Sequence, residues 1–235
     1  MTSQGQAPGP GTERRLLDRL KASLPAALPT ALAAAGADPT AGNDLYEAYL
    51  FSLVLRAAGA EGYAVDLQQS DGGPTSEFRL RRGPGRLPTG DFTHAVLSHP
   101  GAAKGSLEVH TGIAVIGASK VAHEADVLVL RQDVADRCRR LRIDPNSAGA
   151  VIVVEGKYYT RPLSLGMGRQ FLGLDSEMSR RAKTILAATV VNRSVMHLLQ
   201  GRERAYELGV LPGLKAEHDL KERFATILRG YRNGP

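Results

Sequence analysis

The stretch VIVVEGKYYT, residues 151–160, leads four β-branched apolar residues directly into a short charged segment that holds Glu155 and Lys157. Such a run is typical of a strand that is buried on both faces in the centre of a sheet. Because side chains alternate along a strand, Val151 and Val153 should share one face with the two charged residues. Charged groups at the end of a buried strand are costly to desolvate without a partner, so this strand end is a candidate functional site.

Hydrophobic periodicity around this strand predicts alternating helices and strands. The expected helices are 12–35 (capped by Thr12 and interrupted by Pro25 and Pro29), 45–58 with Asn43 as its N-cap, 131–143, 165–178, 194–208 and 214–231. The expected strands are 63–69, 76–82, 92–98, 106–117, 125–130, 149–159 and 184–191. This order predicts an α/β fold with a central mixed β-sheet flanked by α-helices. We expect a disordered N-terminus over residues 1–11 and a single domain over 12–235.

Charge and composition favour a polyanionic partner. The chain has 235 residues, a formal net charge of +6 and a pI near 9.6. Its basic residues cluster at 78–86, 137–142, 179–183 and 201–204, a distribution expected for a nucleic-acid-binding protein. A membrane span needs roughly 18 to 20 consecutive apolar residues, and neither such a run nor a secretory signal is present. We therefore expect a cytoplasmic protein with no membrane partner.

The chain contains one cysteine, Cys138. A single cysteine excludes an internal disulfide and any zinc site built from several cysteines. Its neighbours in DRCRRLR, residues 136–142, are rich in arginine, and nearby positive charge would lower the pKa of the thiol. No base stands beside it in the sequence, so we expect an unreactive thiol rather than a nucleophile.

A second strand carries carboxylates that could reach the first. In HEADVLVL, residues 123–130, Glu124 and Asp126 share one face directly before the apolar run. If the two strands are antiparallel neighbours, Asp126, at the start of its strand, lies near the end of the strand that carries Glu155. Two or three carboxylates and a lysine would then converge. Carboxylates bind Mg²⁺, and an adjacent amine can orient a water or neutralise charge on phosphorus, as phosphodiester hydrolysis requires.

These residues resemble the motif of the PD-(D/E)XK nuclease superfamily, whose restriction-endonuclease-like core holds a mixed sheet between helices. Asp126 matches the first acidic position of that motif, and Glu155 and Lys157 match the (D/E)-x-K on the next strand. Glu47 matches the glutamate that family members often carry on the preceding helix. Gln170, beside Arg169, matches the polar residue of the helix that follows. The resemblance spans about residues 43–192, although no proline precedes Asp126.

The resemblance implies an endonuclease that hydrolyses DNA phosphodiester bonds with Mg²⁺, or Mn²⁺, as cofactor. Asp126 and Glu155 would bind the metal, Lys157 would activate or orient the attacking water, and Glu47 would hold a second metal or a metal-bound water. Gln170 would contribute to the catalytic site. Restriction or anti-phage defence is the expected role. The arginine clusters would hold the phosphate backbone, a homodimer is plausible, and an activating partner protein or small signal is compatible with the family.

Several alternatives remain open from the sequence. The chain could be a catalytically silent or partner-activated nucleic-acid-binding subunit on the same fold, or a nuclease directed at RNA. Glu124 competes with Asp126 for the first acidic position, and Glu155 and Lys157 could be an ordinary surface pair. His94, His99 and His110 lack the spacing of metal ligands, so we expect structural or exposed roles for them.

Overall fold

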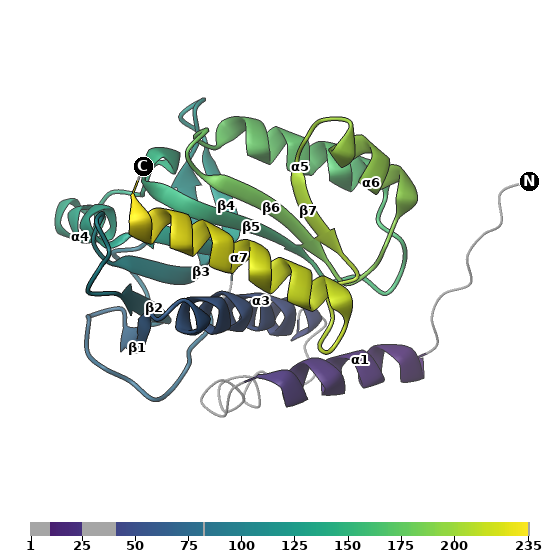
Figure 1. Ribbon diagram of the computed structural model, residues 1–235, viewed down its shortest axis with the longest axis horizontal. Coiled ribbons are helices and arrows are strands. Elements are labelled where there is room, and N and C mark those ends of the chain that lie inside the picture. Colours follow the sequence, from purple (N-terminus) through teal and green to yellow (C-terminus); the bar gives the residue numbers. More distant parts are fainter. Residues whose placement is uncertain (1–9, 25–40, 82, 235) are drawn as a thin grey trace, which may run out of the picture.

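The computed structural model describes residues 10–24, 41–81 and 83–234 (Figure 1). Its helices are α1 (Pro10–Ser23), α3 (Ala41–Ala60), α4 (Gln132–Leu141), α5 (Leu165–Glu177), α6 (Arg193–Gln200) and α7 (Lys215–Asn233). Its strands are β1 (Ala64–Gln69), β2 (Thr93–Ser98), β3 (Leu107–Ile116), β4 (Ala122–Arg131), β5 (Ala150–Lys157), β6 (Lys183–Ala188) and β7 (Ala205–Leu208). The disorder expected for residues 1–11 falls outside the described residues except at 10 and 11, which open α1. Residues 25–35 of the first expected helix also lie outside the described residues.

The seven strands form one mixed sheet in the order β1-β2-β3-β4-β5-β6-β7. Strands β1 to β5 are antiparallel to their neighbours, whereas β5, β6 and β7 run parallel. The parallel strands are joined through α5 and α6, because the chain must cross back to the end of the sheet where the previous strand began before it can start a parallel strand. The expected α/β class and the mixed sheet flanked by helices are thus confirmed, with β5 in the interior of the sheet.

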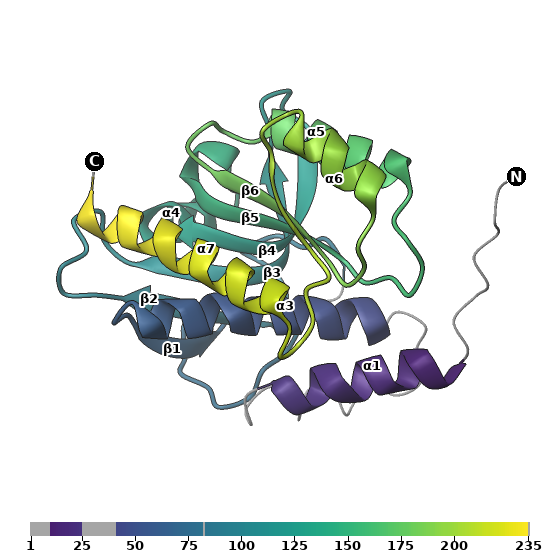
Figure 2. The same ribbon diagram turned by 45° about the vertical axis from the view of Figure 1, so that its right-hand side comes forward.

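Helices cover both faces of this sheet. Helices α3 and α7 lie side by side across one face, and α1 packs against α3 (Figures 1 and 2). On β6, Ile185 and Ala187 join the α3 and α7 core, while the alternating Leu186 and Ala188 join a core with α5 and α6. Helix α4 packs on this second face too, through Cys138 and its neighbours. None of the helices in the described ranges is long and apolar enough to cross a membrane.

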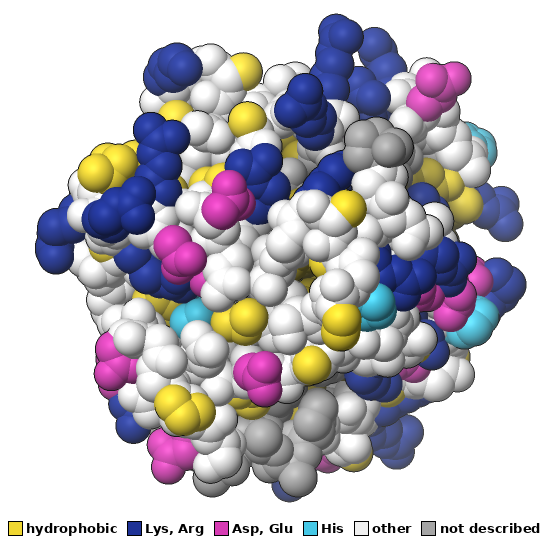
Figure 3. All heavy atoms as spheres, turned by 60° about the vertical axis from the view of Figure 1, so that its left-hand side comes forward, with side chains coloured by type: hydrophobic (Ala, Val, Ile, Leu, Met, Phe, Trp, Pro, Cys, Tyr) yellow, Lys and Arg dark blue, Asp and Glu magenta, His cyan; other side chains and the backbone are white. Residues whose placement is uncertain are grey.

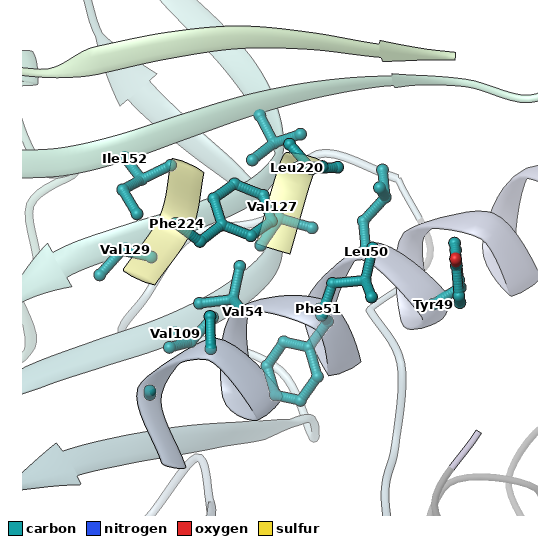
Figure 4. Close-up of a cluster of buried hydrophobic side chains, with 14 of the residues drawn as sticks. Tyr49, Leu50, Phe51, Val54, Val109, Val127, Val129, Ile152, Leu220 and Phe224 are labelled. Atoms are coloured by element: carbon teal, nitrogen blue, oxygen red, sulfur yellow. The ribbon is translucent and has the colours of Figure 1, made fainter. Parts of the chain in front are cut away.

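Helix α3 is apolar around most of its circumference because it is buried on several sides. Leu50 and Val54 face the strand residues of the core, and Phe51 packs against Phe78 with ring centroids 5.0 Å apart (Figure 4). The helix begins at Ala41 rather than at 45, so the expected N-cap, Asn43, lies inside the first turn. This shift matters for function because it places one more turn of α3 beside the strand ends.

Two expected elements are wrong. Residues 76–81 form no strand in the described structure. Arg79 contacts only the first residue of β2: its backbone N–H donates to Thr93 Oγ1 and its carbonyl accepts from the Thr93 N–H, so no ladder forms. The helix expected over 194–208 ends at Gln200, and its last residues form β7 beside β6. Tyr206 and Leu208 pack in the α5 and α6 core at strand spacing, so tertiary packing outweighs the helical pattern there.

Strand β5 has a local irregularity that alters one expected contact. The β4–β5 register pairs Val129 with Ile152 but Leu130 with Ala150, which leaves Val151 in a bulge. Val151 therefore packs on the α3 side, whereas Val153 packs on the opposite face. The expectation that both valines share a face is wrong for this reason.

Cys138 is 3 % exposed on α4. Burial raises the pKa of its thiol, and the nearby Asp144 carboxylate raises it further, while Arg137 and Arg139 act in the opposite direction. The expected lowering of this pKa is therefore wrong. The thiol is therefore protonated at neutral pH.

A buried polar cluster lies between β2, β3 and α4. The rings of His94 and His110 stack with centroids 5.0 Å apart. Glu108, 1 % exposed, lies 2.8 Å from His110 Nε2 and accepts hydrogen bonds from both terminal nitrogens of Arg139 at 2.8 and 2.5 Å. The expectation of a structural role for these two histidines is thus supported by their burial. His99, in contrast, uses Nδ1 to accept from the Gly101 backbone at the surface.

This cluster should make stability fall in mild acid. Burial, and then repulsion from His110, lowers the pKa of His94 to about 3. The unfolded chain takes up a proton on His94 near pH 6.5 while the folded chain does not, so the free energy of unfolding drops as pH falls from there. We expect His94 to account for about 1.4 kcal/mol per pH unit between pH 6 and pH 4.

Urea unfolding of wild type and His94→Gln at pH 7, 6, 5 and 4 measures this slope. The variant should be less stable at pH 7 but should lose stability less steeply toward pH 4. The matched control is His218→Gln, since His218 is exposed on α7. Parallel curves for wild type and His94→Gln would contradict the prediction.

Candidate active site

The candidate site forms where β4 and β5 separate. Their pairing ends at Val127 and Val154. Beyond this point β4 remains paired with β3 as far as Ala122, and β5 remains paired with β6 as far as Lys157. Asp126 therefore lies within β4 rather than at its start, because the pairing with β3 extends the expected strand by three residues, to Ala122. The expected antiparallel arrangement is nevertheless present, and it brings Asp126 next to the end of β5.

Asp126 bridges the gap between the separating strands. Its Oδ2 accepts the backbone N–H of Gly156 at 2.7 Å, and the residue is 9 % exposed. Burial, and then the negative charge of Glu155, raises the pKa of Asp126 to about 7. Lys157 and the Gly156 N–H already oppose this rise, so a further cation would be needed to keep the carboxylate fully ionised at neutral pH.

Gly156, the middle residue of the E-x-K stretch, has a packing role. A Cβ on Gly156 would lie 2.8 Å from Leu50 Cδ1 of α3 and 3.6 Å from Asp126 Oδ2. The absence of a side chain thus lets α3 approach the strand end closely. This close approach is what brings the first turns of α3 to the carboxylates.

Glu155 and Lys157 form an ion pair at the end of β5. Their Oε1 and Nζ atoms lie 2.5 Å apart, and the side chains are 20 % and 25 % exposed. Burial lowers the pKa of Lys157, but the charges of Glu155 and Asp126 outweigh it, and the pKa is raised overall. Lys157 is therefore a stable ammonium that can orient a water or neutralise negative charge, rather than a free base.

Helix α3 contributes a third carboxyl group. Burial, followed by the charge of Asp126, raises the pKa of Glu47 to about 9, and Lys157 offsets only part of this effect. At neutral pH Glu47 is thus a neutral acid that can donate a hydrogen bond, and a cation placed between the carboxylates would draw off its proton.

These groups surround a cavity of about 190 Å³. The residues that line it come from α3, β4, β5 and the segment that follows β5: Asn43, Tyr46, Glu47, Asp126, Gly156, Lys157, Tyr158 and Tyr159. The buried hydroxyls of Tyr46 and Tyr158 have no hydrogen-bond partner within the described residues. Sequence reasoning missed Tyr46 and assigned Asn43 to a cap; the signal that could have found Tyr46 is a polar aromatic directly beside Glu47 on an apolar helix.

Three of the carboxylate and amide residues considered for the site do not line this cavity. Gln170 is exposed on α5 and does not line the cavity. Glu124 also stays outside the lining, although burial and the charge of Glu155 raise the pKa of its carboxyl group. Glu155 itself faces Lys157 rather than the cavity. The structure therefore brings together Glu47, Asp126 and Lys157, with Glu155 adjoining.

The donor atoms of the site suit a hard divalent cation. Asp126 Oδ1 and Glu155 Oε2 accept no hydrogen bond from the described residues. No three His, Cys, Asp or Glu side chains in the described part of the chain are arranged as a metal-binding group. An ion here would be held by two carboxylates and would complete its shell with water and substrate oxygens, which is the usual habit of Mg²⁺.

The basic clusters are unevenly placed around this site. In the first two, Arg86 pairs with Asp144 at 2.8 Å, Arg81 lies over the Phe92 ring at 3.6 Å, and Arg139 pairs with Glu108. Lysine and arginine side chains are spread over the face shown in Figure 3, with acidic side chains between them. The clusters at 179–183 and 201–204 lie at the far end of the parallel strands from Lys157.

Comparison of the chain with protein-family models, with curated proteins and with solved structures finds no match.

The raised pKa of Glu47 predicts that Glu47→Gln increases the stability of the metal-free protein at alkaline pH. The unfolded carboxyl group loses its proton near pH 4.5 and the folded one near pH 9, so the free energy of unfolding falls as pH rises between these values. The expected loss is about 1 kcal/mol per pH unit. Glu47→Gln removes this loss and should be more stable than wild type at pH 8 in EDTA.

Urea unfolding in EDTA at pH 5.5, 7 and 8.5 measures the difference, which should grow with pH. The control is Glu77→Gln, because the Glu77 side chain is 66 % exposed. A Glu47→Gln protein that is less stable than wild type at pH 8.5 would contradict the prediction.

Proposed function

We propose that the chain is a metal-dependent endonuclease of the PD-(D/E)XK type that hydrolyses DNA phosphodiester bonds. The observation that carries the proposal is the meeting of Asp126, Lys157 and Glu47 around one cavity where β4 and β5 separate, with Glu155 paired to Lys157 beside it. The restriction-endonuclease-like core is part of the proposal, supported by a mixed sheet in which α3 packs beside the two motif strands.

In this mechanism, Asp126 and Glu155 would be the residues that hold Mg²⁺ or Mn²⁺. When bound, the ion supplies Lewis-acid stabilisation of charge on the phosphate and lowers the pKa of water. Water adds to phosphorus and one P–O ester bond breaks, leaving a phosphate monoester and an alcohol. The Lys157 ammonium orients the water and neutralises negative charge on the phosphoryl oxygens.

Glu47 adds a proton-transfer group beside these charges. In the metal-free chain its carboxyl group is protonated at neutral pH. With a cation nearby, the carboxylate form becomes favoured, and Glu47 can then accept a hydrogen bond from a water molecule in the cavity. Tyr46 lines the same cavity and its hydroxyl has no partner among the described residues, so it is the proposed hydrogen-bond donor to a phosphate oxygen.

DNA is the proposed substrate because the chain is basic and because carboxylates beside a lysine are groups that phosphodiester hydrolysis can use. Phosphate contacts of this kind give affinity that falls with salt and carry no sequence information. A biological role in restriction or anti-phage defence in the cytoplasm, and activation by a partner or by pairing of two copies, belong to the same proposal.

Cleavage assays test the proposed function directly. Purified wild type should cut at least one of supercoiled plasmid, linear duplex, single-stranded DNA or RNA with Mg²⁺ or Mn²⁺, and not with EDTA. Asp126→Asn and Lys157→Gln should lower the rate by at least about 100-fold, the usual effect of losing a group that acts in the transition state.

The matched controls are Asp133→Asn and Lys215→Gln, whose side chains are 68 % and 86 % exposed. Both should cut at the wild-type rate, and circular dichroism should show all four variants folded. Cutting of RNA alone would reassign the substrate. Absence of cutting on every substrate, or cutting that survives both site substitutions, would overturn the free-standing nuclease.

A further inference from the structure

A second and larger cavity lies at the opposite end of the parallel strands. It has a volume of about 610 Å³ and opens between the end of α5 and the starts of β6 and β7. Cavities of roughly 300 to 1,000 Å³ are typical of small-molecule sites. The nuclease proposal makes no use of this cavity.

The cavity is far from the candidate active site. Lys183 in its wall is level with Ile152 on β5, whereas Lys157 is level with Ala188 at the other end of β6. Five residues of extended strand separate the two levels, or roughly 17 Å at about 3.3 Å per residue. The cavity is therefore a separate site rather than an extension of the first.

Two basic clusters of the sequence meet in this cavity. Arg180 and Lys183 come from the cluster at 179–183, and Arg204 comes from the cluster at 201–204. Arg204 Nε is 2.7 Å from Asp175 Oδ2, so this cation is already compensated. Arg180 and Lys183 have no ion-pair partner within the described residues, and Glu203 is the remaining carboxylate of the lining.

A buried hydroxyl is unused in the same wall. Thr184 lines the cavity and is 5 % exposed, yet its Oγ1 has no hydrogen-bond partner in the described structure. A buried hydroxyl without a partner costs about 1 to 3 kcal/mol. A ligand that accepts from this hydroxyl would remove that penalty, which is an argument for a ligand independent of the charges.

We propose that this cavity binds a small phosphate-bearing molecule of nucleotide size. Arg180 and Lys183 contribute donors and positive charge to the phosphate, and Thr184 contributes a third donor. Phosphate offers several acceptor oxygens with a charge that these groups match. The cavity is larger than a bare phosphate requires, and Met178, Ala182 and Ala205 provide apolar surface for an organic portion.

Isothermal calorimetry on the full chain tests the proposal with AMP, adenosine and pyrophosphate as probes. AMP and pyrophosphate should bind in one-to-one stoichiometry in EDTA, and adenosine should bind at least about tenfold more weakly than AMP, a difference of about 1.4 kcal/mol. Lys183→Gln and Thr184→Val should each weaken AMP binding by at least about fivefold. Arg181→Gln is the matched control, because Arg181 is exposed in the same cluster but outside the cavity lining.

Two additional measurements separate a binding defect from a folding defect and from failure of the nuclease proposal. Thr184→Val should leave the stability of the ligand-free protein equal to or above wild type, because the lost hydroxyl had no partner, so its weakened binding is not a folding defect. Asp126→Asn should bind AMP normally whether or not the nuclease proposal holds. Three results would overturn the proposal. The first is that neither phosphate probe shows saturable binding at about 10 mM. The second is that AMP binding is unchanged by both Lys183→Gln and Thr184→Val. The third is that a single-stranded oligonucleotide binds at this cavity while AMP does not.

Discussion

The separation of β4 from β5 after Val127 and Val154 is the constraint on which the rest of the site depends. Where two strands separate, a backbone N–H that would have bonded to the neighbouring strand needs another acceptor. Asp126 supplies it by accepting from Gly156. The carboxylate is thereby fixed at the point where β5 carries its charged residues, and the same separation leaves space for a cavity between the strands and α3.

The candidate site holds several acidic side chains close together, an arrangement of charge that the fold itself does not require. Burial raises the pKa values of Asp126 and Glu47. Repulsion adds to this effect, from Glu155 on Asp126 and from Asp126 on Glu47, and Lys157 supplies the ammonium that opposes it. Clusters of perturbed carboxyl groups in a cavity are characteristic of functional sites, where a ligand restores the electrostatic balance. In contrast, Glu108 is equally buried but is compensated by Arg139 and His110, which lower its pKa to about 2 despite the opposing effect of burial. One cluster is closed within the protein, and the other is open to a cation.

The parallel part of the sheet separates two regions of different chemistry. Its carboxyl end, at Lys157, gathers acids, whereas its amino end, at Lys183, gathers cations around an unused hydroxyl. Residues on β6 connect the two ends through Ala188, which is paired with Lys157. The two cavities are thus lined by neighbouring strands of one sheet, β4 and β5 at the acidic end and β6 and β7 at the cationic end.

The sequence by itself determined the class of the fold and the strand over 151–154, because strand periodicity follows from local residue order. It placed Asp126 beside the end of that strand only on the condition that the two strands are antiparallel neighbours, which the structure supplied. It could not determine the start of α3, the strand β7 in place of a helix, or the bulge at Val151, because these depend on contacts between distant segments. Tertiary structure alone brought Tyr46 into the site, left Gln170 outside it, and joined two basic clusters around Thr184. Such convergence is a property of the packed sheet, since it joins residues that the chain order keeps apart.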